Sequence, residues 1–387
     1  MGRCRRRAGC HAMDCRAIQS SGTGREPGPR RESHGGIMRK LYIPILVIGL
    51  ATLYLGLAGC VTLTDKSIPV QRTAAAAELQ PASGTLNVMT WNIGYSGLGE
   101  ESDFQADGGT MLRPPSKAVV EKNLSGISAV LKDHQPDIIL MQELAADGFL
   151  TRGVNVLGTV KHSLADYSMF FSSDIRTRFF PGPISLKHGL GTFLRVANKG
   201  TKIVRIPEEP EALMGFIRRR YHVQVTELKL GETDWAVINV HLSAFDEGAN
   251  TRMQQLRAVL DLARSYYDSG KAVAVGGDWN MRLTPTDFSY TADDSAQFWI
   301  HDFPREELGD GWQIAVDPST PSVRTNEQTY KAGVNYTTII DGLIVSPNVE
   351  IVSAKGLDLS FQYTDHQPVM VTLRAVATGD APVEAVN

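Results

Sequence analysis

The stretch GGDWNMRL fills residues 276–283 and directly follows the apolar run AVAV at residues 272–275. A short apolar run of this kind predicts a buried strand, which here ends in an aspartate, a tryptophan and an asparagine. Side chains two residues apart on an extended segment point the same way, so Asp278 and Asn280 are expected to face one common ligand, while Trp279 points into the core. One such pair is a weak sign of a site, so its weight depends on what other strand ends carry.

Polar side chains also stand at the ends of other strand-like runs. The run 86–91 is followed by Asn92, and the run 137–141 is followed by Gln142 and Glu143. Four more polar residues lie within or next to such runs: His241, Asp341, Asp365 and His366.

Two strand–helix–strand units frame this pattern. Ser116–Asp133 has apolar residues at helical spacing and is followed by a Gln-Pro stop and by the strand at 137–141. Thr251–Ser269 repeats the plan, with Gly270 as a C-terminal cap and a strand at 271–275. Between the two units, strand-like runs cover residues 167–172, 191–196, 220–228 and 235–241. The main body is therefore predicted to be mixed α/β.

Six short motifs follow one another along this body: TWNI, QE, NVHL, GGDWN, IDGLIV and TDHQPV. Each is weak alone, but in this order and spacing they resemble the endonuclease/exonuclease/phosphatase superfamily, the DNase I-like enzymes. The motifs lie between Thr85 and about Leu373, which is nearly the whole body. The resemblance implies a four-layer α/β sandwich, in which two mixed β-sheets pack face to face with helices outside and the active site lies at one edge.

The resemblance also implies hydrolysis of a phosphate ester by attack of water at phosphorus, assisted by a divalent cation, usually Mg²⁺, with Mn²⁺ as the alternative. Carried over to this sequence, Glu143 is the main metal ligand, with Asn92 nearby and Asp365 in the same cluster. Asp278 orients or deprotonates the attacking water, and Asn280 hydrogen-bonds a phosphate oxygen. Such a set suits Mg²⁺, a hard ion that prefers oxygen ligands and retains several waters.

Two histidines complete the implied site. His366 and Asp341 form a hydrogen-bonded pair, in which the carboxylate fixes the imidazole tautomer and favours the protonated form beside an anionic phosphate. His241 is a second histidine near the leaving group. The resemblance does not decide between Asp278 and His366 as the general base. Taken singly, each of these residues has an ordinary structural explanation, so the prediction depends on the ordered set.

The N-terminal part of the chain resembles a bacterial lipoprotein signal. Met38 opens a short basic start, residues 41–56 form an apolar run, and small residues lead directly into Cys60. The signal would cover residues 38–59, and a lipid on Cys60 would anchor the exported protein to the membrane of the cell envelope. A single transmembrane helix is the alternative, which the length of the run barely permits. Val61 favours the outer membrane, if the organism has one.

The remaining segments set the domain boundaries. Residues 1–37 precede a complete signal, so we expect a mis-assigned start or a disordered basic extension there. Residues 60–84 are expected to form a tether, 85–376 the catalytic domain and 377–387 a disordered tail. No cysteine follows Cys60, which excludes a disulfide framework or a Cys-based zinc site in the body.

The charge of the body is acidic. The whole chain carries −3, to which residues 1–37 contribute +5 and Arg39 with Lys40 contributes +2, so about −10 remains for the mature protein. This balance gives no sign of a dedicated polyanion binder. In the middle segment, 147–234, Arg219 and Arg220 are candidate ligands for a second phosphate or a lipid headgroup, as is the pair Lys187-His188. A solvated sheet edge is the commoner explanation of such basic runs, and we favour it.

The sequence is compatible with three functions. The first is a metal-dependent phosphodiesterase or phosphatase that acts on small or lipid phosphoesters at the cell envelope, which the lipid anchor and the acidic body favour. The second is an extracellular or periplasmic nuclease, which a salt-sensitive activity on plasmid DNA would reveal. The third is a non-catalytic envelope binding protein on the same fold, and the complete set of metal-binding and proton-handling residues argues against it. In each case a monomer is expected.

Overall fold

The computed structural model describes residues 35–64, 68–74, 84–176, 185–209, 219–244 and 248–376. They divide into two units within helix α1 (Gly35–Thr64), with the boundary between Tyr54 and Leu55. Among the residues whose side chains are described, no helix has a stretch that is long and apolar enough to cross a bilayer. The signal at 38–59 and the lipid on Cys60 stay predictions, and residues 1–34 and 377–387 lie outside the described residues.

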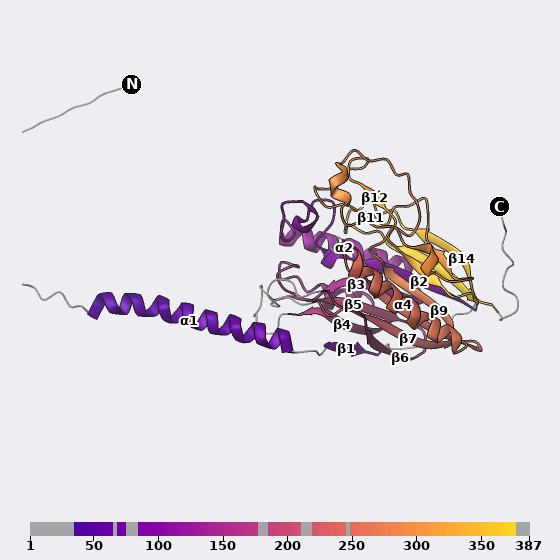
Figure 1. The fold of residues 1–387 in the computed structure, drawn as a ribbon, viewed down its shortest axis with the longest axis horizontal. Coiled ribbons are helices and arrows are strands. Elements are labelled where there is room, and N and C mark those ends of the chain that lie inside the picture. Colours follow the sequence, from indigo (N-terminus) through magenta and orange to yellow (C-terminus); the bar gives the residue numbers. More distant parts are fainter. Residues whose placement is uncertain are drawn as a thin grey trace, which may run out of the picture. The chain divides into compact units, whose positions relative to one another are not determined.

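Two mixed β-sheets form the frame of the second unit (Figure 1). The first has the order β1-β4-β5-β3-β2-β15-β14, with bounds β1 Val70–Thr73, β2 Thr85–Asn92, β3 Ile138–Ala145, β4 Ser168–Arg176, β5 Lys187–Leu194, β14 Val349–Gly356 and β15 Val369–Ala375. The second has the order β10-β13-β9-β8-β7-β6, with bounds β6 Asn198–Arg205, β7 His222–Leu230, β8 Thr233–His241, β9 Ala272–Asp278, β10 Gln313–Ala315 and β13 Asp341–Val345. The short strands β11 (Val323–Arg324) and β12 (Thr337–Thr338) pair separately.

Helices cover the two outer faces of these sheets. α2 (Lys117–His134) and α3 (Val156–Ser163) pack on the first sheet, and α4 (Asn250–Asp268) packs on the second. Between the sheets, Val88 and Leu140 of the first share one apolar cluster with Val237 of the second. Trp91 packs in the α2 layer and Ile238 in the α4 layer. The predicted four-layer α/β sandwich is confirmed.

The two long helices form where the sequence predicts them, to within one residue at each end. The hydroxyl of Ser116 accepts a hydrogen bond from the backbone N–H of Val119 at 3.2 Å and so caps the first turn of α2. Gln135 ends the same helix in the left-handed region, with φ of 40°, directly before a proline that cannot continue the helix.

The topology brings the polar strand ends to one edge. β2–α2–β3 and β8–α4–β9 each join two parallel strands, and parallel strands have their carboxyl ends at the same edge of a sheet. Asn92 therefore lies level with Gln142, and His241 lies level with Asp278. β13 runs antiparallel to β9, so its first residue, Asp341, is also level with Asp278.

One expected boundary is wrong in part. Residues 60–84 were expected to be a tether, but Val70–Thr73 pairs antiparallel with β4 and forms the edge strand of the first sheet. The side chains of β1 are mostly exposed, so no apolar alternation announces this strand. β6, another edge strand with a mostly exposed pattern, escaped prediction for the same reason.

Candidate active site

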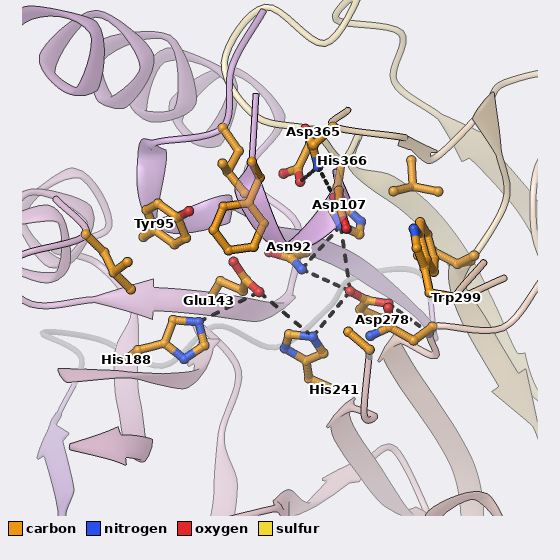
Figure 2. Close-up of a pocket in the computed structure, with 18 of the residues that line it drawn as sticks. Asn92, Tyr95, Asp107, Glu143, His188, His241, Asp278, Trp299, Asp365 and His366 are labelled. Atoms are coloured by element: carbon orange, nitrogen blue, oxygen red, sulfur yellow. Dashed lines mark hydrogen bonds and ion pairs between the residues drawn. The ribbon is translucent and has the colours of Figure 1, made fainter. Parts of the chain in front are cut away.

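A cavity of about 390 Å³ lies at the edge where these strand ends meet (Figure 2). Ionisable and amide groups line one part of it, and apolar side chains line the rest. Nine of the residues that the sequence singled out line this cavity: Asn92, Glu143, His188, Arg219, His241, Asp278, Asn280, Asp365 and His366. The fold therefore brings together groups that are distributed over more than 270 residues of sequence, from Asn92 to His366.

Asp278 ends β9 with its carboxylate held by two donors. Asn92 Nδ2 donates to Oδ2 at 2.9 Å, and the backbone N–H of Asn280 donates to Oδ1 at 2.9 Å. Burial raises the pKa of Asp278 above its ordinary value; the charge of His366 opposes this rise, and the nearby Asp341 adds to it. A fixed carboxylate of raised pKa at a cavity wall is suited to receive a proton.

Asn280 reaches the cavity by a route that the sequence did not predict. β9 already ends at Asp278, and Asn280 has a left-handed φ of 51°, so the two side chains do not share a strand face. The carboxamide of Asn280 donates from Nδ2 to the carbonyl oxygen of Leu242 at 3.0 Å. Trp279 is fully buried in the α4 layer, as expected of a core residue. Both residues line the cavity, but the strand-alternation argument for their shared direction is wrong, and a common ligand stays a prediction.

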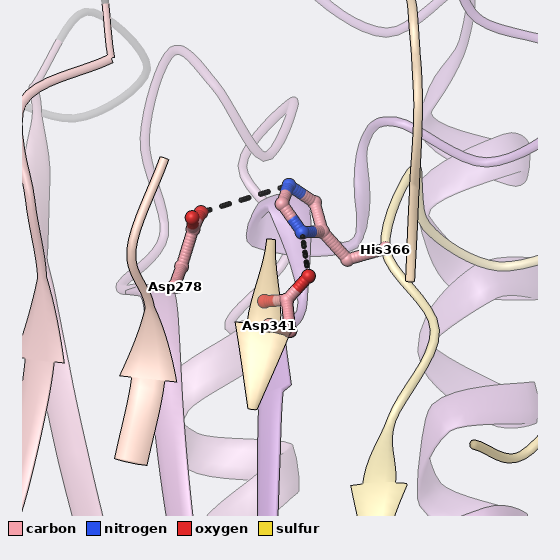
Figure 3. Close-up of side chains that lie close together, drawn as sticks. All are labelled: Asp278, Asp341 and His366. Atoms are coloured by element: carbon pink, nitrogen blue, oxygen red, sulfur yellow. Dashed lines mark hydrogen bonds and ion pairs between the residues drawn. The ribbon is translucent and has the colours of Figure 1, made fainter. Parts of the chain in front are cut away.

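His366 lies between two carboxylates (Figure 3). Its Nδ1 is 2.9 Å from Asp341 Oδ2, and its Nε2 is 3.7 Å from Asp278 Oδ2. Burial by itself would lower the pKa of His366, but Asp341 and Asp278 outweigh it and raise the pKa well above its ordinary value. Ser322 donates a further hydrogen bond of 2.8 Å to Asp341 Oδ2. The imidazole is therefore fixed and favoured in its charged form.

The carboxylate of Glu143 has no close donor among the side chains that the structure describes. Its nearest charged neighbours among the described residues are His188 Nε2 at 3.8 Å and His241 Nε2 at 4.0 Å from Oε1. Burial would raise the pKa of Glu143, but the positive charges of His188 and Arg219 outweigh it and lower the pKa to about 2. Glu143 therefore stays ionised and keeps oxygen lone pairs available to a cation.

Asp365 belongs to a second carboxylate pair that the sequence did not reveal. Asn326 Nδ2 donates to Asp365 Oδ2 at 2.8 Å and to Asp107 Oδ2 at 3.0 Å. Burial raises the pKa of both aspartates, that of Asp107 to about 7. Asp107 ends a single 3₁₀ turn and Asn326 lies in a loop, so neither has a periodic sequence context that could have indicated it.

The oxygen donors on this wall fit a hard cation such as Mg²⁺. Glu143 and Asp365 offer carboxylates to the cavity, and Asn92 adds a carboxamide oxygen that accepts only the backbone N–H of Gly94, at 3.0 Å, among the described residues. Asp278, Asp341 and His366 also have ligand atoms within 4.8 Å of one another. In that trio the imidazole of His366 already hydrogen-bonds Asp341. A nitrogen ligand also suits Mg²⁺ less well than oxygen does, so a shared proton accounts for the closeness of these three side chains better than a bound Mg²⁺.

A buried charged network lies next to Glu143. Asp174 Oδ1 lies 2.8 Å from His188 Nδ1, and Asp174 Oδ2 accepts a hydrogen bond of 2.8 Å from Arg219 Nε. Burial would lower the pKa of His188, but Asp174 and Glu143 outweigh it and raise the pKa to about 9. The sequence did not indicate Asp174 as a site residue, because a lone aspartate near a strand end has no distinctive pattern around it.

The solvated sheet edge favoured for the basic runs is wrong for His188, Arg219 and Arg220. Arg219 and His188 line the cavity, with His188 only 4 % exposed. Arg220 is 7 % exposed and is not among the residues that line the cavity; its Nη1 lies 3.6 Å from Glu208 Oε2. The tertiary structure buries these cations because it provides each with a carboxylate partner.

The fold and the site define a DNase I-like α/β sandwich protein. The chain belongs to the endonuclease/exonuclease/phosphatase family, whose model matches residues 89–366. Members of this family are phosphoester hydrolases. A search of curated proteins finds no significant match to the sequence.

Solved structures share the fold at low sequence identity. An endonuclease/exonuclease/phosphatase from Beutenbergia cavernae is 19% identical, with a TM-score of 0.51 over 78% of this chain and 73% of that one. A D. rerio TDP2 humanized by 14 mutations is 15% identical, with a TM-score of 0.49 over 76% of this chain and 100% of that one. A family member from Bacteroides vulgatus is 15% identical, with a TM-score of 0.47 over 75% and 99%. The likeness to the Beutenbergia protein establishes the fold alone.

Proposed function

We propose that the protein is a Mg²⁺-dependent phosphoesterase that hydrolyses a small or lipid phosphoester at the cell envelope, by attack of water at phosphorus. The observation that carries this proposal is that one cavity contains both a carboxylate that can bind a cation and a pair of groups that can exchange protons. Glu143 offers an ionised carboxylate that has no close donor in the described part of the chain, while Asp278 and His366 form a carboxylate–imidazole pair that lines the same cavity. Phosphoester hydrolysis needs both a cation site and groups that hold protons.

Each side of the cavity has its own task in this proposal. Glu143, Asn92 and Asp365 would hold Mg²⁺, which when bound neutralises charge that develops on the phosphoryl oxygens. Asp278 is fixed by Asn92 and by the backbone of Asn280, so it can orient the water and receive its proton.

The remaining polar groups bind the phosphate. His366, held through Nδ1 by Asp341, presents Nε2 toward the space in front of Asp278. A charged imidazole there stabilises the negative phosphoryl group and can return a proton to the leaving oxygen. Asn280 adds a carboxamide to the same wall. This division makes Asp278 the base and His366 the acid.

The cavity wall supports a substrate with an apolar part. Beyond the polar groups, it is lined by Leu98, Phe104, Leu150, Ile175, Leu186, Trp299, Val323 and Ile340. Apolar lining stabilises a ligand that leaves water with its hydrocarbon or aromatic portion. The acidic body would repel an extended polyanion such as DNA. A lipid on Cys60 would keep this cavity near membrane lipids.

The test compares substrates under matched conditions. Full-length protein in detergent is incubated with p-nitrophenyl phosphate, bis(p-nitrophenyl) phosphate, phospholipid in mixed micelles and supercoiled plasmid, each with Mg²⁺ or with EDTA. We expect Mg²⁺-dependent turnover of a small or lipid phosphoester that exceeds plasmid nicking. Faster, salt-sensitive plasmid nicking would favour the nuclease instead. Folded protein without turnover of any substrate would favour a binding protein.

A further inference from the structure

The guanidinium group of Arg219 faces one ring nitrogen of His241, a histidine that lines the cavity. Arg219 Nη2 lies 2.9 Å from His241 Nδ1, at the carboxyl end of β8. Arginine carries only N–H donors and stays protonated in proteins, so it cannot accept a hydrogen bond. The nitrogen that faces it must therefore be the acceptor. Nδ1 of His241 is therefore unprotonated, because only a nitrogen without a proton can accept this hydrogen bond.

Arg219 is held in this position by further partners. Its Nε donates to Asp174 Oδ2 at 2.8 Å, and its guanidinium stands 4.7 Å from the ring centroid of Tyr221. Asp174 is 5 % exposed and also bonds His188 Nδ1 at 2.8 Å. Rotation of Arg219 away from His241 would disturb a buried ion pair, which is costly because the carboxylate would lose a partner in a poorly solvated place.

The other ring nitrogen of His241 points to the reacting side. Nε2 lies 3.5 Å from Asp278 Oδ2 and 4.0 Å from Glu143 Oε1, as the dashed lines in Figure 2 indicate. Both distances are at or beyond the usual hydrogen-bond limit. An N–H at this nitrogen is therefore not fully used by either carboxylate, and it can turn to a phosphoryl oxygen that enters between them.

We propose that Arg219 is a positioning residue that holds His241 in the neutral tautomer with its proton on Nε2. His241 then serves the phosphoester as a fixed hydrogen-bond donor, and it neither removes nor supplies a proton. The tautomer is independent of the substrate, whereas its catalytic consequence rests on the proposed phosphoester hydrolysis. Proton movement in that reaction falls to Asp278 and His366.

The charges around His241 agree with this geometry. Burial lowers the pKa of His241 well below its ordinary value, and Arg219 lowers it further. Glu143 from β3 and Asp174 from β4 oppose this shift, while His188 from β5 reinforces it. Asp278 from β9 is a further charged group that faces the ring. The two histidines of the site therefore differ in the group that faces Nδ1, which is the guanidinium of Arg219 for His241 and the carboxylate of Asp341 for His366.

The experiment reads the ring nitrogens directly. Full-length protein in detergent, labelled with ¹⁵N-histidine, is studied by long-range ¹H–¹⁵N NMR near neutral pH, with EDTA and then with Mg²⁺, and His241→Gln assigns the signals. We expect His241 to show an unprotonated Nδ1 and a protonated Nε2. A protonated Nδ1, in either the other neutral tautomer or the imidazolium, would overturn the proposal. No substrate is present, so failure of the proposed hydrolysis would leave this result intact.

Two variants test the role of Arg219 itself. In Arg219→Met the acceptor loses its donor and the ring loses a neighbouring cation, so we expect signals of mixed tautomers or of imidazolium. Arg220→Met removes an adjacent buried arginine that is not among the residues that line the cavity, and should leave the His241 signals as in the parent. Unchanged His241 signals in Arg219→Met would refute the positioning role. Circular dichroism checks folding, and if Arg219→Met does not fold, the parent spectrum still decides the tautomer.

Discussion

Glu143 reaches the cavity because the chain leaves the regular pleat at this residue. In β3, Ile139 and Met141 pack outward in the α2 layer, so regular alternation would also send Glu143 outward. Its φ is 55°, and the pairing of β3 with β5 shifts register between Met141 and Leu144. Such a bulge redirects a side chain, and bulges often lie beside active sites. A left-handed φ in a residue other than glycine costs about 1–3 kcal/mol. The backbone of Glu143 therefore lowers the stability of the fold while it directs the carboxylate into the cavity.

Glu143→Gln should abolish Mg²⁺-dependent turnover and leave the fold intact, because an amide keeps the shape and loses the charge that binds the cation. Turnover against Mg²⁺ concentration, together with thermal melting, measures both effects. Glu121→Gln, at an exposed position on α2, is the matched control and should behave as the parent. Near-normal turnover of Glu143→Gln at saturating Mg²⁺ would contradict the assignment.

His366→Ala should lower kcat by about 10²–10⁴-fold, as expected for a group that transfers a proton and stabilises the phosphoryl charge. The measurement is steady-state kinetics on the best substrate, with circular dichroism to confirm folding. A rate that stays within a few-fold of the parent would mean that the bond between His366 and Asp341 is only structural.

Tyr167 gives a pH prediction that lies outside the site. Its hydroxyl donates to the carbonyl oxygen of Pro136 at 2.5 Å, and burial raises its pKa to about 12 from 10.0. The phenol ionises first in the unfolded chain, so its stabilising contribution is complete below pH 10 and is lost as the pH rises to 12. The free energy of unfolding should fall by about 1.4 kcal/mol per pH unit in this window from this group.

Tyr167→Phe removes that group and serves as its own control for all other alkaline titrations. Denaturant unfolding at several pH values between 9 and 12 gives the free energy of unfolding of the parent and of the variant. The parent should be the more stable by a constant difference up to pH 10, and this difference should shrink above pH 10. A difference in the free energy of unfolding that does not change with pH would show that Tyr167 has the same pKa in the folded and unfolded chains.

At the scale of elements, the helices are encoded locally and the edge strands are not. α2 combines an apolar stripe, a serine cap and a proline stop, all of which can be read within one segment. β1 has mostly exposed side chains, and only its pairing with β4 makes it a strand. A strand whose stability comes from backbone hydrogen bonds to a distant neighbour has no pattern of its own.

Ser116→Ala should reduce the free energy of unfolding by about 1 kcal/mol, because the N–H of Val119 loses its capping acceptor. Denaturant titration measures the change. Ser125→Ala, at an exposed interior position of the same helix, is the matched control and should be neutral or slightly stabilising, since alanine has the higher helix propensity. Equal effects of the two substitutions would contradict the capping role.

At the scale of the whole molecule, hydrogen bonds join the two sheets beneath the cavity. Gln142 of the first sheet donates to Asn239 Oδ1 of the second at 2.8 Å, and Asn92 donates to Asp278 at 2.9 Å. These polar contacts replace the apolar core at the edge of the sandwich. Buried amides must bond to one another where they cannot reach water, so the site and the packing of the sheets are coupled.

The proposed membrane attachment also concerns the whole molecule. If residues 38–59 are a lipoprotein signal, Cys60→Ser should eliminate incorporation of labelled fatty acid when the full chain is produced in a bacterial host, because the lipid would be attached to the thiol of Cys60. Metabolic labelling followed by electrophoresis measures it. Cys15→Ser, in the segment before Met38, should leave labelling unchanged. Label that persists in Cys60→Ser would argue against a lipoprotein.

The sequence by itself determined the fold class, the two strand–helix–strand units and the set of polar strand ends. These features depend on local periodicity, on caps and on motifs whose order survives without contacts. The tertiary structure alone decided how Glu143 and Asn280 point, and which partners Asp107, Asp174 and Arg219 have. Those properties come from positive φ values and from contacts between residues far apart in the chain, and packing, not the neighbouring sequence, sets both.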